Sequence, residues 1–499
     1  MRSKNTLKRL LPALCLFLAG LSCTAPPGLR PVDYVDPLID SHKSRWIYFS
    51  SACRPFGMVN LSPDTWVQGT WNSGYMYDSL HVRCFSHIHA WQMAGIPVMP
   101  TSGRFRGHLG MEANKSSFSH EKEFVTPGYH QVYLEDYDIK AEITSTVRTG
   151  FHRYTFPAGE DNYILFDVGA FLAHGPITRA GIYRVNDKEI AGYSLVGKTR
   201  RRPKDTFVYF VARFDRPFER FAGWKNGEIL ERDSIQGENT GGYVQFRTEE
   251  DDPVLVKVGI SYTGIAQARL NLETEIPHWD FDMIRKESAD EWNEWLSRIE
   301  VEGGTEKQRI KFYTDLWHAL LGRRIVSDVD GSYCDMTGEE PAVRRVRLDA
   351  NGQPLFPQQN SDSFWGTHWS LNILWPLAYP GVMDAFCNSF VEIYKHGGLI
   401  PRGPSGGNYT FVMIGDQAAP FIAAAWNKGI RNFDAEKAYK GLLINSEVGG
   451  IRDHAGYEHQ EQASGGGMKY YLERGYIPQN IGGSGFHREG AAMTMEYAY

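Results

Sequence analysis

The spacing of apolar residues changes once along this chain, near residue 275. Before that point, short runs rich in β-branched and aromatic residues are separated by clusters of Gly, Pro, Asn and Asp, and many runs alternate apolar with polar side chains. Such alternation is typical of β-strands. The clearest runs span residues 129–134, 139–156, 163–168, 207–214, 243–247 and 254–262. So many strands with no helical pattern between them predict a large antiparallel β-sandwich over residues 33–275.

After residue 275 the apolar residues recur at helical spacing. We expect two helices in a linker over residues 276–325, one carrying Trp292 and Trp295 and the next carrying Leu316 and Trp317. Further helices are expected at residues 369–378, 382–396, 417–428 and 435–446, with Gly- and Pro-rich loops between them. The predicted fold class is therefore multidomain α+β. It comprises an N-terminal antiparallel β-sandwich, a helical linker and, over residues 326–499, the N-terminal part of an (α/α) six-hairpin barrel.

The first residues have the character of a targeting segment. Basic residues precede an apolar run over residues 10–21, which is too short to span a bilayer and predicts a signal peptide over residues 1–22. The segment ending at Cys23 resembles a bacterial lipoprotein box, although Gly20 stands where Leu is usual. We expect lipidation of Cys23 and a tether over residues 23–32, with plain secretion as the alternative. The protein is then exported to the periplasm or outer-membrane surface of a Gram-negative bacterium, and only its lipid anchor contacts the membrane.

Charge and cysteine content exclude several classes of function. The formal net charge is −6 with both signs interspersed, and no block of Lys and Arg predicts a nucleic-acid partner. Six cysteines without CxxC spacing argue against a disulfide framework or a zinc site. Aromatic residues make up 13% of the chain, which suits either a carbohydrate-binding protein or a large β-rich core.

The first candidate site lies early in the chain. Trp71 is followed by the segment Cys84-Phe-Ser-His-Ile-His-Ala-Trp91. If this segment is extended, His87 and His89 share one face, and together with Trp71 and Trp91 they suit hydrogen bonding and stacking to a sugar. The alternative is a histidine pair buried in the sandwich and satisfied by backbone groups. A zinc site would need a third protein ligand, which is not evident nearby.

The second candidate site is the segment Asp362-Ser-Phe-Trp-Gly-Thr-His-Trp369. Trp365 and His368 at the start of a predicted helix suit the floor of a sugar subsite, and aromatic packing at a domain seam is the alternative. The segment Asp328-Val-Asp-Gly331 resembles part of a calcium loop, but it lacks the later ligands and is predicted to be a turn. No nucleophile elbow, Walker loop or dinucleotide fingerprint is present.

Together these segments resemble glycoside hydrolase family 92. Its opening motifs are similar to Tyr34-Val-Asp-Pro-Leu-Ile39, Pro55-Phe-Gly-Met-Val59, Leu61-Ser-Pro-Asp64, Ser73-Gly-Tyr75 and Phe85-Ser-His-Ile-His89. Later motifs are similar to Gly259-Ile-Ser-Tyr262, Ala268-Arg269, Asn271-Leu272, Phe312-Tyr-Thr314, Asp328-Val-Asp-Gly331, Lys428-Gly-Ile430, Phe433-Asp434, Lys437-Ala-Tyr439 and Met495-Glu-Tyr-Ala-Tyr499. The matches run in order from about residue 33 to residue 499, and their order makes the resemblance specific.

The resemblance implies an exo-acting, calcium-dependent, inverting α-mannosidase that trims terminal α-mannose from glycoprotein glycans. Inversion needs a carboxylic acid for the leaving oxygen and a carboxylate that activates water. In the family this acid and base, and the main calcium ligands, lie downstream of the motif that here ends at Tyr499. We therefore expect the catalytic residues beyond Tyr499, an incomplete barrel, and no activity from this chain by itself.

Some residues depart from the family pattern. Cys84 stands where many members have Gly, and Gly366 replaces the Asp of a Trp-Asp-Thr motif that contacts mannose. These departures predict a divergent subgroup and leave its linkage specificity, and even the identity of its sugar, open. Two rival functions remain open: a carbohydrate-binding protein without turnover, and an amidase acting on glycan–protein linkages. The expected partners in each case are glycans, with mannose-containing glycans favoured.

Overall fold

The computed structural model describes residues 28–43, 50–68, 73–91, 93–172, 176–199, 202–322, 324–360, 364–410, 415–454 and 467–479. The predicted signal peptide, Cys23 and Trp71 lie outside these residues. Among the described helices, none is both long enough and apolar enough to cross a membrane.

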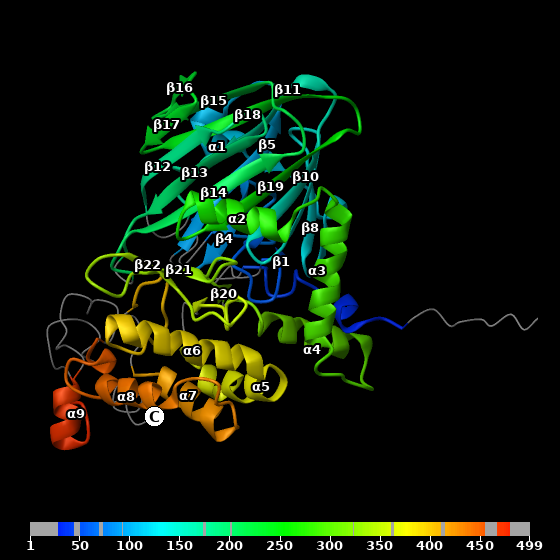
Figure 1. The fold of residues 1–499 in the computed structure, drawn as a ribbon. Helices are drawn as coiled ribbons and strands as arrows, with labels where there is room; N and C mark the ends of the chain where they lie inside the picture. Colours follow the sequence, from blue (N-terminus) through cyan, green and yellow to red (C-terminus); the bar gives the residue numbers. More distant parts are fainter. Residues whose placement is uncertain are drawn as a thin grey trace, which may run out of the picture.

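The N-terminal half is a sandwich of two antiparallel sheets (Figure 1). One sheet has eight strands in the order β1 (Ala52–Cys53), β2 (Asn60–Asp64), β4 (Cys84–Ala90), β5 (Met93–Ser102), β11 (Gly159–Phe166), β18 (Thr240–Thr248), β15 (Arg220–Lys225) and β16 (Glu228–Leu230). The other has nine, in the order β17 (Ser234–Gly237), β12 (Ile177–Arg184), β13 (Glu189–Val196), β14 (Thr206–Phe214), β19 (Pro253–Ser261), β10 (Thr149–Thr155), β9 (Ile139–Ser145), β8 (Tyr129–Leu134) and β7 (Phe124–Thr126). The predicted antiparallel β-sandwich is confirmed.

Strand alternation decides which side chains form the core. On β14, Val208, Phe210, Ala212 and Phe214 face inward and join the core between the sheets. The strand expected over residues 139–156 is two strands, β9 and β10, because the chain turns after Ser145 and pairs back on itself. This hairpin keeps both strands in one sheet, where each buries one face.

Three helices connect the sandwich to the helical half. α2 (Ile265–Glu275) packs on the outer face of the nine-stranded sheet, where Ala268 and Leu272 contact Ala191 and Val211. Residues 265–275, which were included in the predicted sandwich, therefore form a helix that covers it. α3 (Phe281–Leu296) and α4 (Glu306–His318) match the two helices expected in the linker, and each begins at an N-capping side chain.

The helical half packs α5 (Leu371–Ala378), α6 (Pro380–Gly397), α7 (Ala418–Asn427) and α8 (Ala435–Asn445) against one another, with α9 (Met468–Arg474) at one end (Figure 1). Its core also includes Trp292 and Trp317 from the linker, and Val32 and Phe56 from the N-terminal half.

Three small strand pairs complete the described chain: β3 (His81–Val82) with β6 (Ser116–Ser117), β20 (Arg324–Ile325) with β23 (Gln359–Asn360), and β21 (Ser332–Asp335) with β22 (Ala342–Arg345). The short helix α1 spans Met111–Asn114, and 3-10 helices span Pro31–Tyr34, Gly107–Leu109, His120–Lys122, Thr367–Trp369 and Ile451–Asp453.

Candidate functional site

The seam between the two halves is polar and buried. Arg324, on β20, donates from Nη1 to Oδ1 of Asn60 at 2.5 Å and to the carbonyl of His89 at 3.1 Å. Its guanidinium therefore attaches the helical half to the ends of β2 and β4. Further buried polar side chains here are Gln358, Gln359 and Asn360, on or beside β23, which pairs with β20. Buried polar groups of this density are uncommon between two apolar cores and mark the seam as the candidate site.

One loop, over residues 401–410, connects the two predicted sugar-binding segments. The hydroxyl of Ser405 donates to the carbonyl of Trp91 at 2.9 Å, at the end of the sandwich strand β4. The amide of Phe364 donates to the carbonyl of Arg402 at 3.4 Å, just before Trp365. Trp91 and the segment carrying Trp365 therefore both contact this loop, although they are far apart in the sequence.

The predicted sugar-binding residues differ in how far their side chains are exposed to solvent. Trp91 is buried, His368 is half-buried, and Trp365 is 55% exposed. An exposed tryptophan can stack on the apolar face of a sugar ring while hydrogen-bonding groups hold its hydroxyls. Trp365 and His368 therefore have the accessibility that a sugar contact requires.

His87 lies in the core of the sandwich rather than at a surface. Its ring is 0% exposed; Nδ1 donates to the carbonyl of Ile96 at 2.8 Å, and Nε2 accepts from Nε2 of His152 at 3.0 Å. Nδ1 of His152 in turn accepts from the Tyr154 hydroxyl at 2.8 Å. Burial lowers the pKa of His87 to about 4 and that of His152 well below its ordinary value, so both rings are neutral. A sugar cannot touch the His87 ring in this arrangement, so that predicted contact is corrected to a structural role.

His89 is also buried, but it is charged. Nδ1 donates to the carbonyl of Asn60 at 2.5 Å and Nε2 donates to Oδ1 of Asp64 at 2.9 Å, so both nitrogens act as donors. Burial lowers the pKa of His89, but the Asp64 carboxylate outweighs it and raises the pKa overall. Burial likewise opposes ionisation of Asp64, and His89 with Ser86 brings its pKa below the ordinary value. This ion pair stabilises the end of β4 that Arg324 contacts. His89 therefore positions the backbone at the seam without being exposed there itself.

Asp416 is a buried carboxyl group in the helical half, two residues before α7. Oδ2 accepts from the Asn445 amide at 2.9 Å, and Oδ1 accepts from the backbone of Ala418 at 3.2 Å. Burial raises its pKa, which Asn445 and the nearby Arg452 and Arg402 only partly offset.

The described residues do not fit a calcium ion. The carboxylates of Asp40 and Asp315 with the His318 ring are the group of potential ligands that lie within 4.8 Å of one another. Calcium takes six to eight oxygen ligands, whereas this group offers an imidazole, and both oxygens of Asp315 accept from Lys311. The predicted turn at Asp328 is confirmed, since the amide of Gly331 donates to the Asp328 carbonyl at 2.9 Å. The Asp328 carboxylate accepts hydrogen bonds from protein donors. We therefore assign no calcium ligand within the described chain.

Comparisons with known proteins agree with this two-part organisation. The glycosyl hydrolase family 92 N-terminal domain matches residues 34–261, and the family 92 catalytic domain matches residues 267–499. No protein of curated function matches the chain.

Solved structures show the same fold. The family 92 α-mannosidase BT3965 from Bacteroides thetaiotaomicron, solved in complex with mannoimidazole, is 26% identical with a TM-score of 0.81. The match covers 94% of this chain and 60% of that one, so the chain spans less than two thirds of that relative. The inverting mannosidase BT2199 from B. thetaiotaomicron VPI-5482 is 24% identical with a TM-score of 0.81, over 95% of this chain and 62% of that one. On these domain matches and this shared fold, the chain belongs to glycoside hydrolase family 92.

Proposed function

We propose that this protein is an exo-acting glycosidase that removes terminal α-mannose from glycoprotein glycans with inversion at the anomeric carbon. The observation that carries the proposal is the seam, where Ser405 contacts Trp91 and the same loop contacts the segment before Trp365, in a chain with both family 92 domains. The names of the structural relatives, an α-mannosidase and an inverting mannosidase, support the sugar and the stereochemistry.

In this proposal Trp365 stacks on the sugar ring, and His368 and the buried polar side chains of the loop orient its hydroxyls. Arg324 and the Asp64–His89 pair act indirectly, because they position the end of β4 and the carbonyls that meet the loop. The general acid and base are not assigned to residues. We also propose that residues 326–499 form the first part of an (α/α) barrel, that the enzyme uses calcium, and that Cys23 carries a lipid anchor after export.

The reaction can be tested by the anomer that is released. The chain is extended beyond Tyr499 to include the expected acid and base and is mixed with an α-linked mannobiose and calcium. Free mannose is followed by proton NMR during the first minutes, before mutarotation. We expect β-mannose to appear first. First appearance of α-mannose would contradict inversion, and sugar binding with no release would favour a carbohydrate-binding protein. The anchor is tested separately by labelling cells with radioactive fatty acid, which the Cys23→Ala variant should not incorporate.

One observation bears on the amidase alternative. The hydroxyl of Ser51 lies 2.7 Å from Nδ1 of His130, whose Nε2 lies 2.8 Å from Oε1 of Glu123. This order of groups resembles a serine–histidine–carboxylate triad. However, Ser51 is 4% exposed, and Glu123 also accepts from Tyr75 and His120, as expected for a structural hydrogen-bond network. We therefore retain the glycosidase as the leading function and use Ser51 as a discriminating test below.

A further inference from the structure

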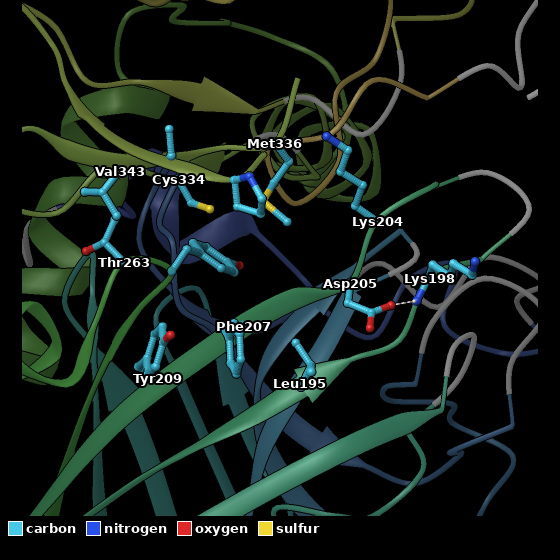
Figure 2. A pocket seen from close by; sticks show the side chains of 13 residues that line it. Leu195, Lys198, Lys204, Asp205, Phe207, Tyr209, Thr263, Cys334, Met336 and Val343 are labelled. Carbon is cyan, nitrogen blue, oxygen red and sulfur yellow. Dashed lines mark hydrogen bonds between the residues drawn. The ribbon is translucent and has the colours of Figure 1, made fainter. Parts of the chain in front are cut away.

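A cavity of about 660 Å³ lies between the sandwich and the β21–β22 hairpin (Figure 2). Leu195, Phe207 and Tyr209 on β13 and β14 form its floor, and Cys334, Met336 and Val343 on or beside the hairpin form its roof. Its volume lies within the range of about 300–1,000 Å³ that is usual for small-molecule sites. The predicted sugar-binding residues of the seam are not among those that line it.

The floor of this cavity is aromatic and faces away from the sandwich core. Phe207 and Tyr209 alternate with the inward-facing residues of β14, and their rings stack with centroids 5.3 Å apart and an interplanar angle of 17°. α2 covers the next outward position, Val211, but both rings lie beyond that contact and remain only half-buried. Two aromatic rings on an uncovered part of a sheet face offer a flat apolar surface to a ligand.

Polar groups surround this aromatic floor. Asp205 lies at the edge and accepts from the backbone amide of Lys198 at 2.7 Å, and the Thr263 hydroxyl lies at the opposite side (Figure 2). The ammonium group of Lys204 donates to the carbonyls of Gly338 and Glu339, which ties the roof hairpin to the sandwich. An apolar floor with a carboxylate, a hydroxyl and cations at its edge matches a pyranose ring, which has apolar C–H faces and equatorial hydroxyl groups.

The cavity also borders the loop that forms the seam. The amide of Met336 donates to the carbonyl of Gly407 at 3.1 Å, and the amide of Lys204 donates to Oδ1 of Asn408 at 3.1 Å. The same loop contacts Trp91 through Ser405. A ligand in the cavity is therefore separated from the candidate sugar site by one segment of chain.

We propose that this cavity is a second carbohydrate site, in which one mannose unit of a branched glycan stacks on Phe207 and Tyr209 while another terminal mannose occupies the seam. The identity of the sugar rests on the proposed function. The aromatic floor supplies the stacking contact, and Asp205 and Thr263 accept hydrogen bonds from the sugar hydroxyls, since the Thr263 hydroxyl donates its own proton to Asp328. The site holds a distant branch of the substrate and takes no part in bond cleavage.

The test is calorimetric titration of the protein with an α-linked mannotriose. The variants are Phe207→Ala, which removes the floor, and Val343→Trp, which fills the mouth from a residue that is 62% exposed and leaves the core unchanged. The matched control is Phe124→Ala, an exposed Phe on β7 at the far edge of the same sheet. We expect two binding events in the wild type and the control. Each pocket variant should weaken one event by about tenfold or more and leave the other intact.

A separate variant distinguishes failure of this inference from failure of the proposed function. Trp365→Ala should remove the event that Phe207→Ala and Val343→Trp leave intact. If Trp365→Ala abolishes all binding and the pocket variants change nothing, the second site does not exist and the proposed function stands. A third outcome is that the wild type binds no mannoside but binds a glucoside or galactoside, and that Val343→Trp removes this binding. That outcome overturns the mannose assignment at both sites. Because Val343→Trp does not alter buried packing, a folded variant with unchanged titration overturns the inference even if Phe207→Ala is unstable.

Discussion

The side-chain amide of Asn271, on α2, donates a 2.7 Å hydrogen bond to Oδ1 of Asp328, in the segment that leads into the helical half. Ser261, at the end of β19, donates to the other carboxylate oxygen at 3.0 Å. The three residues belong to three separate sequence motifs, and the structure unites them in one buried contact. Motifs that resemble family 92 here have a structural function, which is to join the sandwich to the helical half.

The first prediction concerns the pH dependence of this contact. Burial raises the pKa of Asp328 to about 6 although Thr263, Asn271 and Ser261 donate to it. The folded state therefore binds a proton more tightly than the unfolded state, so stability present at low pH is lost as the pH rises from about 4 to 6. The Asp328→Asn variant should not lose stability in this way. Its free energy of unfolding should rise by about 3 kcal/mol relative to that of the wild type between pH 4 and pH 6.

Urea unfolding at a series of pH values measures the difference. Asp330→Asn is the matched control in the same turn, because hydrogen bonds from Ser332 and the charge of Arg345 outweigh burial and lower the pKa of Asp330. The Asp330 carboxylate of the wild type stabilises the fold above about pH 4, and this stabilisation is lost below that pH. The pH dependence is therefore opposite to that of Asp328. Parallel wild-type and Asp328→Asn curves between pH 4 and 6 would contradict the account.

The second prediction concerns the neutral histidine pair. The folded-state pKa of His87 lies at about 4, and that of His152 is also depressed, so acid favours the unfolded chain. Stability should fall as the pH drops from about 6.5 towards 4, by about 3 kcal/mol for His87 alone. The double variant His87→Leu/His152→Phe should be less stable at pH 7 but have a flatter acid profile. Its mannoside affinity, measured at pH 7 on folded protein, should equal that of the wild type, and a large loss would restore His87 to the sugar site.

The third prediction concerns the buried ion pair. Removing one charge from Asp64–His89 leaves the other buried without its partner, and Asp64→Asn should cost about 3–5 kcal/mol of unfolding free energy. The comparison is Glu231→Gln, which breaks the exposed Arg220–Glu231 pair and should cost less than about 1 kcal/mol. The lowered pKa of Asp64 and raised pKa of His89 place the full contribution of the pair between about pH 4 and 6.5. Equal costs for the two variants at pH 5.5 would show that the pair is not buried in solution.

Local periodicity predicted most of the secondary structure because helices and strands are encoded over a few neighbouring residues. The helix expected at residues 417–428 is α7, Ala418–Asn427, and the strand expected at residues 207–214 is β14. The helix over residues 265–275 was missed because it buries few residues, chiefly Ala268, Asn271 and Leu272, so its apolar stripe is too narrow to detect.

The site was harder to predict because its contacts are long-range. The period of two along a strand placed His87 and His89 on one face of β4. Both faces of β4 are buried, however, so alternation could not decide whether a side chain lies in the sandwich core or at the seam. The partner that fixes His87 as neutral is His152, which is 65 residues away in the sequence. Loop 401–410 was recognised only as Gly- and Pro-rich, since nothing local indicates that Ser405 meets Trp91.

The fourth prediction separates the glycosidase from the amidase. In the chain extended beyond Tyr499, Ser51→Ala should leave mannose release unchanged. It should reduce the free energy of unfolding by about 1–3 kcal/mol, because His130 loses a buried hydrogen-bond partner. Both quantities are measured on the same preparation, by mannose assay and by urea unfolding. If Ser51→Ala abolished cleavage of a glycopeptide amide while mannosides were never hydrolysed, Ser51 would be a nucleophile and the leading function would fail.

Binding of mannose at the seam is tested by a comparison of two exposed tryptophans. Trp365 lies at the seam, whereas Trp426 is 43% exposed on α7 and packs against Arg431. Affinity for mannoimidazole is measured by titration calorimetry for the wild type, Trp365→Ala and Trp426→Ala, with thermal melts to verify folding. We expect Trp365→Ala to weaken binding by about tenfold or more and Trp426→Ala to bind as the wild type does. Equal affinity in all three folded proteins would contradict the assignment of the sugar site to the seam.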